Sequence, residues 1–269
     1  MEPTVQVFWV PKQGNSPDEY EDAYSCAAEE GRFAIADGAT ESSFAEIWAQ
    51  VLVRQFSTTP PNGSPPTSRT LIDWLDPLQK EWHANINWQH LPWYAEEKAK
   101  MGAYATLLGL KFQINKETKS PSLMDKMFSV FKKPEPPKTN WEALAVGDSN
   151  LFQVRDNSLL RAFPMEKAED FNSRPMLLSS NPDNNKPLWA HVAFLQSDCY
   201  EQDIFILATD ALSKWILERH EAGTRPWNTL TAIKTDAEFE KFVNDLRKNT
   251  QLRNDDTTLM VFAWSQNLK

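Results

Sequence analysis

Short segments that alternate apolar and polar residues, with few helices between them, most constrain the fold of this chain. They predict strands at residues 5–10, 23–28, 32–36, 104–114, 141–146, 150–155, 158–163, 188–195, 203–208 and 257–264. In 104–114, one face carries Leu108, Leu110, Phe112 and Ile114. Strand and helix do not alternate regularly, as they would in a parallel sheet. We therefore expect an α+β fold of stacked antiparallel sheets flanked by helices.

Apolar residues at helical spacing predict a helix from about Phe44 to Phe56. Ser43 and Glu46 form the pattern of a capping box at its start. The Pro- and Ser-rich segment 57–68 must end this helix, because proline removes a backbone donor and fixes the chain direction.

Two further helical regions are predicted. Residues 70–101 contain four tryptophans at helix-compatible positions, and a later helix begins near Thr235, where Glu238 completes a second capping box. No shift in composition marks a domain boundary. We expect one domain over 1–269, with insertions near 57–100 and 115–140.

Composition narrows the class of function. The 269 residues carry 37 acidic and 28 basic side chains, a net charge of −9, which argues against binding to nucleic acid. Cys26 and Cys199 stand in no metal-binding spacing, and no glycine-rich phosphate loop is found. We see no signal peptide and no apolar run long enough to span a bilayer. We expect a reduced, cytoplasmic protein with no membrane partner.

Acidic residues mark the ends of predicted strands. Asp37, Asp148 and Asp210 each follow a strand, and Asp255 precedes the last one. In an antiparallel sheet, the end of one strand lies beside the start of its neighbour, so these residues can gather at one rim. Two more acidic residues precede the strand at 23–28 and can join them: Glu21 and Asp22.

Several carboxylates in one cleft repel each other unless cations neutralise them. All-oxygen ligands suit Mg²⁺ or Mn²⁺ rather than Zn²⁺, and two such ions can activate a water and clamp a phosphoryl group. Each acidic residue alone has an ordinary interpretation. Asp37-Gly38 is typical of a hairpin turn, and Asp255-Asp256 is typical of a solvated loop. The prediction rests on the combination of these acidic residues, in this order along the chain.

That combination resembles the protein phosphatase 2C (PPM) family of metal-dependent serine/threonine phosphatases. The matching segments occur in the family's order and span nearly the whole chain: EDA at 21–23, FAIADG at 33–38, GAYATLLGL at 102–110, ALAVGDSNLFQVRDNSLL at 143–160, FILATDAL at 205–212 and NDDTTLMVF at 254–262. The resemblance implies a four-layer αββα sandwich, in which two antiparallel sheets pack face to face with helices on both outer faces. It also implies a binuclear metal centre at one rim.

The resemblance assigns metal ligands by position. Asp37 is similar to the carboxylate that bridges both ions, and the carbonyl of Gly38 to a further ligand. Asp210 and Asp255 resemble the remaining ligands of one ion. Asp148, together with Asp210, resembles the site of a third ion.

It also assigns the carboxylates next to the metal centre. Glu21 is similar to the residue that holds the second ion, partly through water, and Asp22 to its neighbour. Asp37 and Asp22 are the residues that we expect to take part in catalysis. The substrate would be a phosphoprotein, produced by an opposing serine/threonine kinase.

The residues that would bind the substrate phosphate depart from the family pattern. The family usually has an arginine shortly before the Glu-Asp pair, whereas position 17 is proline, and Lys12 is the nearest basic candidate.

Three functions remain open. The first is hydrolysis of phosphoserine or phosphothreonine by a water that two metals activate, without a phosphoenzyme. The second is a phosphatase-like module, weakly active or inactive, that binds a partner. The third is a two-carboxylate glycosidase aided by the eleven tryptophans.

Overall fold

The computed structural model describes residues 3–113, 138–171, 175–186 and 188–263. Most of the insertion expected near 115–140 therefore lies outside the described residues, as does Ile114. Among the described residues, no helix is both long and apolar enough to cross a membrane.

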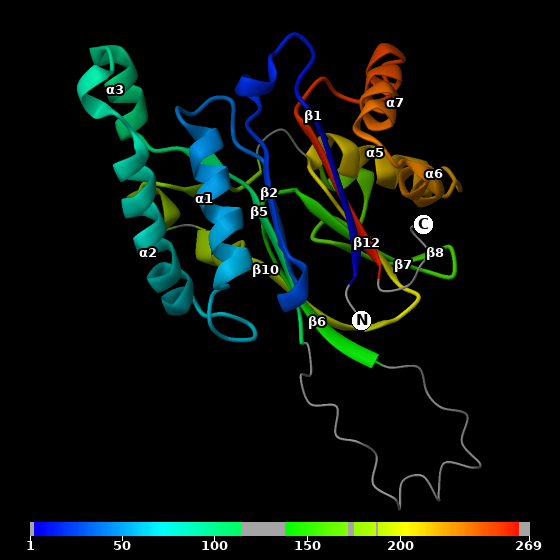
Figure 1. Cartoon of the computed structure of the whole chain (residues 1–269). Coiled ribbons are helices and arrows are strands. Elements are labelled where there is room, and N and C mark those ends of the chain that lie inside the picture. Colours follow the sequence, from blue (N-terminus) through cyan, green and yellow to red (C-terminus); the bar gives the residue numbers. More distant parts are fainter. Residues whose placement is uncertain (1–2, 114–137, 172–174, 187, 264–269) are drawn as a thin grey trace, which may run out of the picture.

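Two five-stranded antiparallel sheets form the centre of the molecule (Figure 1). The first sheet has the spatial order β1 (Thr4–Val10), β12 (Thr257–Ala263), β11 (Ile204–Ala208), β7 (Asn150–Arg155) and β8 (Ser158–Phe163). The second has the order β10 (Ala193–Tyr200), β6 (Lys138–Val146), β5 (Leu107–Phe112), β3 (Arg32–Ala36) and β2 (Ala23–Ala27). A small third sheet pairs β4 (Tyr104–Ala105) with β9 (Leu178–Ser179).

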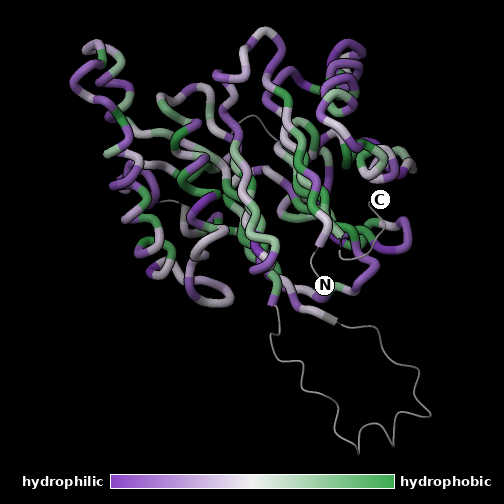
Figure 2. The backbone as a smooth tube through the Cα atoms, in the orientation of Figure 1, coloured by the Kyte–Doolittle hydropathy of each residue, from purple (hydrophilic) through white to green (hydrophobic). Residues whose placement is uncertain are grey.

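Large apolar side chains fill the space between the two sheets. Phe33 of β3 stacks on Phe262 of β12 with 4.1 Å between ring centroids. Leu108, Leu110 and Phe112 point into the same layer, as their alternation predicts. The central strands are accordingly the most hydrophobic part of the backbone trace (Figure 2). Burial of each such side chain stabilises the fold by about 1.5–3 kcal/mol.

Helices cover both outer faces (Figure 1). The second sheet packs against α1 (Ala45–Thr58) and α2 (Ser68–Asn85), and α3 (Trp93–Lys100) follows α2. The first sheet packs against α5 (Asp210–Glu221), α6 (Pro226–Ala232) and α7 (Asp236–Lys248). The predicted four-layer αββα sandwich is confirmed.

Short 3₁₀ turns connect these elements: η1 (Pro17–Glu19), η2 (Ala28–Glu30), η3 (Trp88–His90), η5 (Ala168–Asp170), η6 (Pro182–Asn185) and η7 (Leu188–Ala190). The strand expected over 188–195 is therefore displaced, and β10 begins only at Ala193 and continues into a more polar segment. Such a polar strand is tolerated because β10 lies at the edge of its sheet, paired only with β6.

One of the two predicted capping boxes is wrong. Helix α1 begins after Phe44, whose φ of 60° is left-handed, and no side chain caps its first turn. The second capping box is confirmed, because Thr235 Oγ1 accepts from the Glu238 N–H at 3.3 Å and Glu238 Oε2 accepts from the Thr235 N–H at 3.2 Å.

Candidate active site

Strand ends from both sheets meet at one rim of the sandwich. In the second sheet, the end of β3 lies beside the start of β2, with Ala36 opposite Ala23. In the first sheet, the end of β11 lies beside the start of β12, with Ala208 opposite Leu259. A cavity of about 730 Å³ opens here, and four of the acidic residues singled out in the sequence line it: Asp37, Asp148, Asp210 and Asp255.

Two hydrogen bonds with Thr106, which lies between β4 and β5, hold the backbone of Asp37 in place. Its N–H donates to Thr106 Oγ1 at 2.8 Å, and its carbonyl accepts from the Thr106 N–H at 2.8 Å. Thr106 Oγ1 also lies 2.8 Å from Ser149 Oγ, next to Asp148. Thr106 and Ser149 are almost fully buried. They therefore link the segments that carry Asp37 and Asp148, and our sequence analysis assigned no role to either.

The carboxylates interact strongly with one another. Burial raises the pKa of Asp37 well above its usual range, and the charges of its four acidic neighbours raise it further: Asp22, Asp210, Asp255 and Asp148. Burial, followed by the charge of Asp210, raises the pKa of Asp148 to about 7. The four carboxylates that line the cavity lie close enough together for the charge of one to act on another. The acidic residues at the strand ends thus form a single electrostatic cluster.

Asp22 is not among the residues that line the cavity and is only 2% exposed, and its charge acts on Asp37. Its Oδ2 accepts from the Thr258 hydroxyl at 2.6 Å, while its Oδ1 has no hydrogen-bond partner among the described residues. Burial, with the charge of Asp256, raises the pKa of Asp22 well above its usual range. A buried, half-satisfied carboxylate is costly, which is typical of a functional site.

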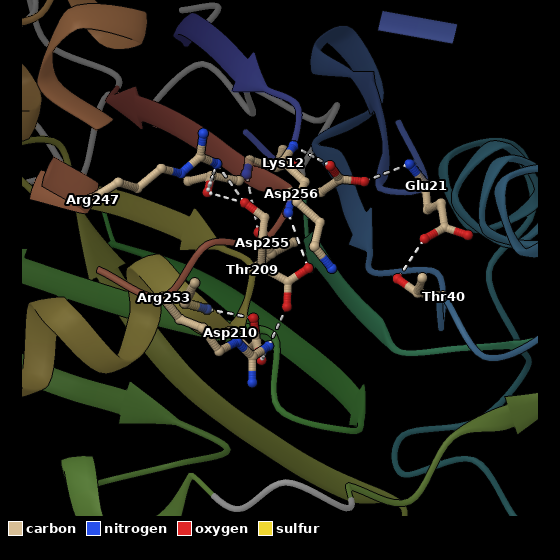
Figure 3. Close-up of polar contacts among 12 residues, drawn as sticks. Lys12, Glu21, Thr40, Thr209, Asp210, Arg247, Arg253, Asp255 and Asp256 are labelled. Atoms are coloured by element: carbon tan, nitrogen blue, oxygen red, sulfur yellow. Dashed lines mark hydrogen bonds and ion pairs between the residues drawn. The ribbon is translucent and has the colours of Figure 1, made fainter. Parts of the chain in front are cut away.

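Glu21 does not point into the cluster. Its Oε2 accepts from the Thr40 hydroxyl at 2.6 Å, and in Figure 3 this pair lies apart from Asp210 and Asp255. Burial raises the pKa of Glu21, and the hydrogen bond from Thr40 acts in the opposite direction. Of the predicted site residues, Glu21 is thus the one whose carboxylate is turned away.

Arg253 lies among the carboxylates, and our sequence analysis did not predict it. Its Nη2 is 2.5 Å from Asp210 Oδ2 and 2.5 Å from Asp255 Oδ2 (Figure 3). Because one nitrogen contacts both carboxylates, these two side chains must lie close together. The only sequence signal was the position of Arg253, two residues before Asp255.

Two buried charged residues fix the loops around the cavity. Asp256 accepts from the N–H of Lys12 at 2.6 Å and from the N–H of Glu21 at 2.7 Å. Arg247 donates to the carbonyls of Pro11, at 2.9 Å, and Asp255. The loop after β1 is thereby attached to the loop before β12, which places the Lys12 side chain at the cavity wall.

The donor set suits hard divalent cations, since it consists of carboxylate and carbonyl oxygens around one cavity. As the side chains stand, no group of three or more His, Cys, Asp or Glu residues within the described ranges is arranged to hold one metal ion. Arg253 is inserted between Asp210 and Asp255, and Glu21 is bonded to Thr40. These two contacts engage carboxylate oxygens that a cation would need, and the oxygen donors themselves are of the type that Mg²⁺ and Mn²⁺ prefer.

Gly38 has no room for a side chain. A Cβ at this position would lie 2.6 Å from the Glu21 carbonyl oxygen and 3.1 Å from Ala45 Cβ. We expect Gly38→Ala to lower the free energy of unfolding by about 1–3 kcal/mol, because backbone would have to move. Urea denaturation followed by tryptophan fluorescence measures this. An unchanged midpoint would show that the loop carrying Glu21 is not packed against Gly38.

No protein-family model and no curated protein sequence matches the chain. Solved structures do match it, over nearly its whole length. The catalytic domain of the serine/threonine protein phosphatase PstP, in complex with two manganese ions, has a TM-score of 0.54 at 14% identity, covering 97% of this chain and 98% of that chain.

Two further structures are similar to the same extent. The photosystem II phosphatase PBCP has a TM-score of 0.53 at 13% identity, covering 97% of this chain and 98% of that chain. PppA, a regulatory component of T6SS in Pseudomonas aeruginosa, has a TM-score of 0.51 at 15% identity, with 98% of each chain covered. The family resemblance read from the sequence is thereby confirmed at the level of architecture, and the chain has the fold of the protein phosphatase 2C family.

Proposed function

We propose that the protein is a metal-dependent phosphatase that hydrolyses phosphoserine and phosphothreonine in proteins, without a phosphoenzyme intermediate. One observation carries this proposal: Asp37, Asp148, Asp210 and Asp255, from both sheets, line a single cavity in this fold. Burial and the charges of acidic neighbours raise the pKa values of Asp37 and Asp148, as expected of a site that divalent cations would stabilise.

The ligand assignments are those that the family resemblance implies, and the shared cavity of Asp37, Asp148, Asp210 and Asp255 supports them. Asp37 faces the other carboxylates and would contact both of two Mn²⁺ or Mg²⁺ ions, next to the carbonyl of Gly38. Asp210 and Asp255 would complete the set around one ion, and Asp148, beside Asp210, offers a place for a third. Bound ions would supply an activated water and neutralise phosphoryl oxygens.

Glu21 would reach the second ion after leaving Thr40. Asp22, buried behind the cluster with one free oxygen, would orient the Asp37 segment and its water. Lys12 and Arg253 line the cavity and place positive charge where phosphoryl oxygens would bind. These roles belong to the chain itself and can be tested one residue at a time.

The substrate that fits this chemistry is a phosphoprotein made by a serine/threonine kinase. The cavity is open and about 730 Å³ in volume, enough for a phosphorylated side chain with part of its backbone. We place the reaction in the cytoplasm, where unpaired thiols such as Cys26 and Cys199 persist.

The test is hydrolysis of a phosphothreonine peptide by the purified full chain. We expect phosphate release with Mn²⁺ and none with excess EDTA, and restoration when Mn²⁺ is added back. A phosphotyrosine peptide serves as the comparison substrate and should be turned over more slowly. If Mn²⁺ produces no release above that of an Asp37→Asn variant, the proposal is wrong.

A non-catalytic or weakly active module that binds a partner or phosphoprotein is the second candidate. It is favoured by the Glu21–Thr40 hydrogen bond and by the Arg253 contacts, which both keep carboxylates from a metal. Mn²⁺ binding by calorimetry without turnover, together with tight binding of an intact phosphopeptide, would favour this candidate over the enzyme.

A further inference from the structure

Arg253 makes an unusual set of contacts for an arginine in a protein. Its Nη2 atom contacts both Asp210 and Asp255, while its Nε and Nη1 atoms donate to no atom of the described residues. Its side chain is 56% exposed and lines the cavity. Three of the five N–H donors of the guanidinium therefore have no partner among the described residues, in a side chain that lines the cavity.

A purely structural ion pair elsewhere in the same molecule looks different. Arg155 contacts Asp203 with two nitrogens, Nε to Oδ1 at 2.5 Å and Nη2 to Oδ2 at 2.8 Å. Asp203 is fully buried there. That two-pronged geometry is the stable way to join the two groups. Arg253 instead spreads one nitrogen over two carboxylates, which is the arrangement of a shared counter-ion.

The two residues that follow Arg253 are anchored to neighbouring loops, whereas the Arg253 side chain is more than half exposed. The side chain of Asn254 exchanges two hydrogen bonds with the backbone of Gln13, at 2.7 and 3.2 Å. Arg247 donates to the carbonyl of Asp255, the next residue along the chain. A long, half-exposed side chain on a fixed backbone can change partners at little cost.

Three positive side chains line this cavity: Lys12, Lys98 and Arg253. Only the guanidinium has the planar fork that binds a phosphoryl group through two parallel hydrogen bonds. Cations at Asp210 and Asp255 would take the carboxylate oxygens that Arg253 now contacts and would repel its charge. A phosphate in the cavity would attract it.

We propose that Arg253 exchanges between two anionic partners, the Asp210–Asp255 carboxylates in the cation-free protein and the phosphoryl group of the substrate in the cation-loaded one. The proposal rests on the proposed function for the identity of the substrate. It has two measurable parts: Arg253 competes with divalent cations, and it binds phosphate once they are bound.

Calorimetric titration with Mn²⁺ tests the first part. Arg253→Gln removes the charge but keeps a polar side chain, and Arg69→Gln, on the outer face of α2, is the matched control for the loss of one positive charge. We expect Arg253→Gln to bind Mn²⁺ about fivefold more tightly than the wild type, the effect of losing a partly exposed ion pair. Arg69→Gln should bind as the wild type does. Equal affinity in Arg253→Gln and the wild type would overturn the competition.

Titration of the Mn²⁺-saturated protein with inorganic phosphate tests the second part. We expect Arg253→Gln to weaken phosphate binding about tenfold, and Arg253→Lys, which keeps the charge but loses the fork, to lie between. In peptide hydrolysis, the Arg253→Gln change should raise KM more than it lowers kcat. Unchanged phosphate binding in Arg253→Gln would overturn this part.

The outcomes separate this proposal from the proposed function. If the wild type turns over phosphopeptide and Arg253→Gln matches it in KM, in Mn²⁺ affinity and in phosphate affinity, Arg253 has no such role and the enzyme assignment stands. If both affinities change as expected but the wild type releases no phosphate, the exchange stands and the enzyme assignment fails. Thermal melting of each variant verifies that the fold is intact.

Discussion

Replacing Asp37 with asparagine is expected to abolish Mn²⁺-dependent hydrolysis and, at the same time, to stabilise the metal-free protein. Asp37 faces four other carboxylates, and both its burial and their charges raise its pKa. Asparagine has nearly the same shape and no charge, so it cannot bridge two cations and it relieves the repulsion. We expect kcat/KM to fall by about 10³-fold or more. The metal-free Tm should rise by a few degrees, since about 1 kcal/mol shifts Tm by about 2–4 °C at this size.

Both quantities are measured on the same samples, by peptide hydrolysis and by thermal melting with and without Mn²⁺. The wild type should melt higher when Mn²⁺ is added, and Asp37→Asn should lose most of that increase. Asp73→Asn, an exposed change on α2, is the control and should alter neither. Loss of activity with a lower metal-free Tm would instead mean that Asp37 stabilises the fold, which contradicts the electrostatic argument.

A site that lowers stability is expected when a fold brings like charges together for catalysis.

The positions of these residues in the sequence are what indicated the site. Asp37, Asp148, Asp210 and Asp255 stand at strand ends, and antiparallel pairing brings strand ends together whatever the exact register. Alternation of apolar residues locates the strand ends, and antiparallel packing of the strands offers a common rim where those ends can meet. The fold class and the cavity-lining carboxylates could be predicted for this reason.

Side-chain direction could not be predicted in the same way. Glu21 and Asp22 are adjacent, yet Asp22 is buried against Thr258 and Glu21 turns to Thr40. Successive residues of an extended segment point to opposite sides, and the sequence does not say which side faces the cavity. Arg253 was missed because its role depends on the contacts of one long side chain. Similarly, the failure of the Ser43 cap depends on the backbone angle of Phe44.

The second large effect is expected on stability, from Asp256, which holds together the loops that form the cavity wall. Its two oxygens accept from the N–H groups of Lys12 and Glu21, so a single buried carboxylate joins three loops. We expect Asp256→Ala to lower the free energy of unfolding by about 3 kcal/mol or more, because two partly buried donors lose a charged acceptor. Asp256→Asn keeps one acceptor oxygen and should lose about half as much.

Urea denaturation of these variants, next to the exposed control Asp18→Ala, measures the loss. Mn²⁺ titration of the same proteins then shows whether the walls also position the metal ligands. Since Asp256 binds the Glu21 backbone directly, we expect weaker Mn²⁺ binding in Asp256→Ala even where the protein remains folded. If Asp256→Ala is as stable as the control, water replaces the carboxylate at both N–H groups. Other contacts then hold the loops in place. A graded loss from aspartate through asparagine to alanine would instead identify these two hydrogen bonds as the link between the stability of the rim and the geometry of the site.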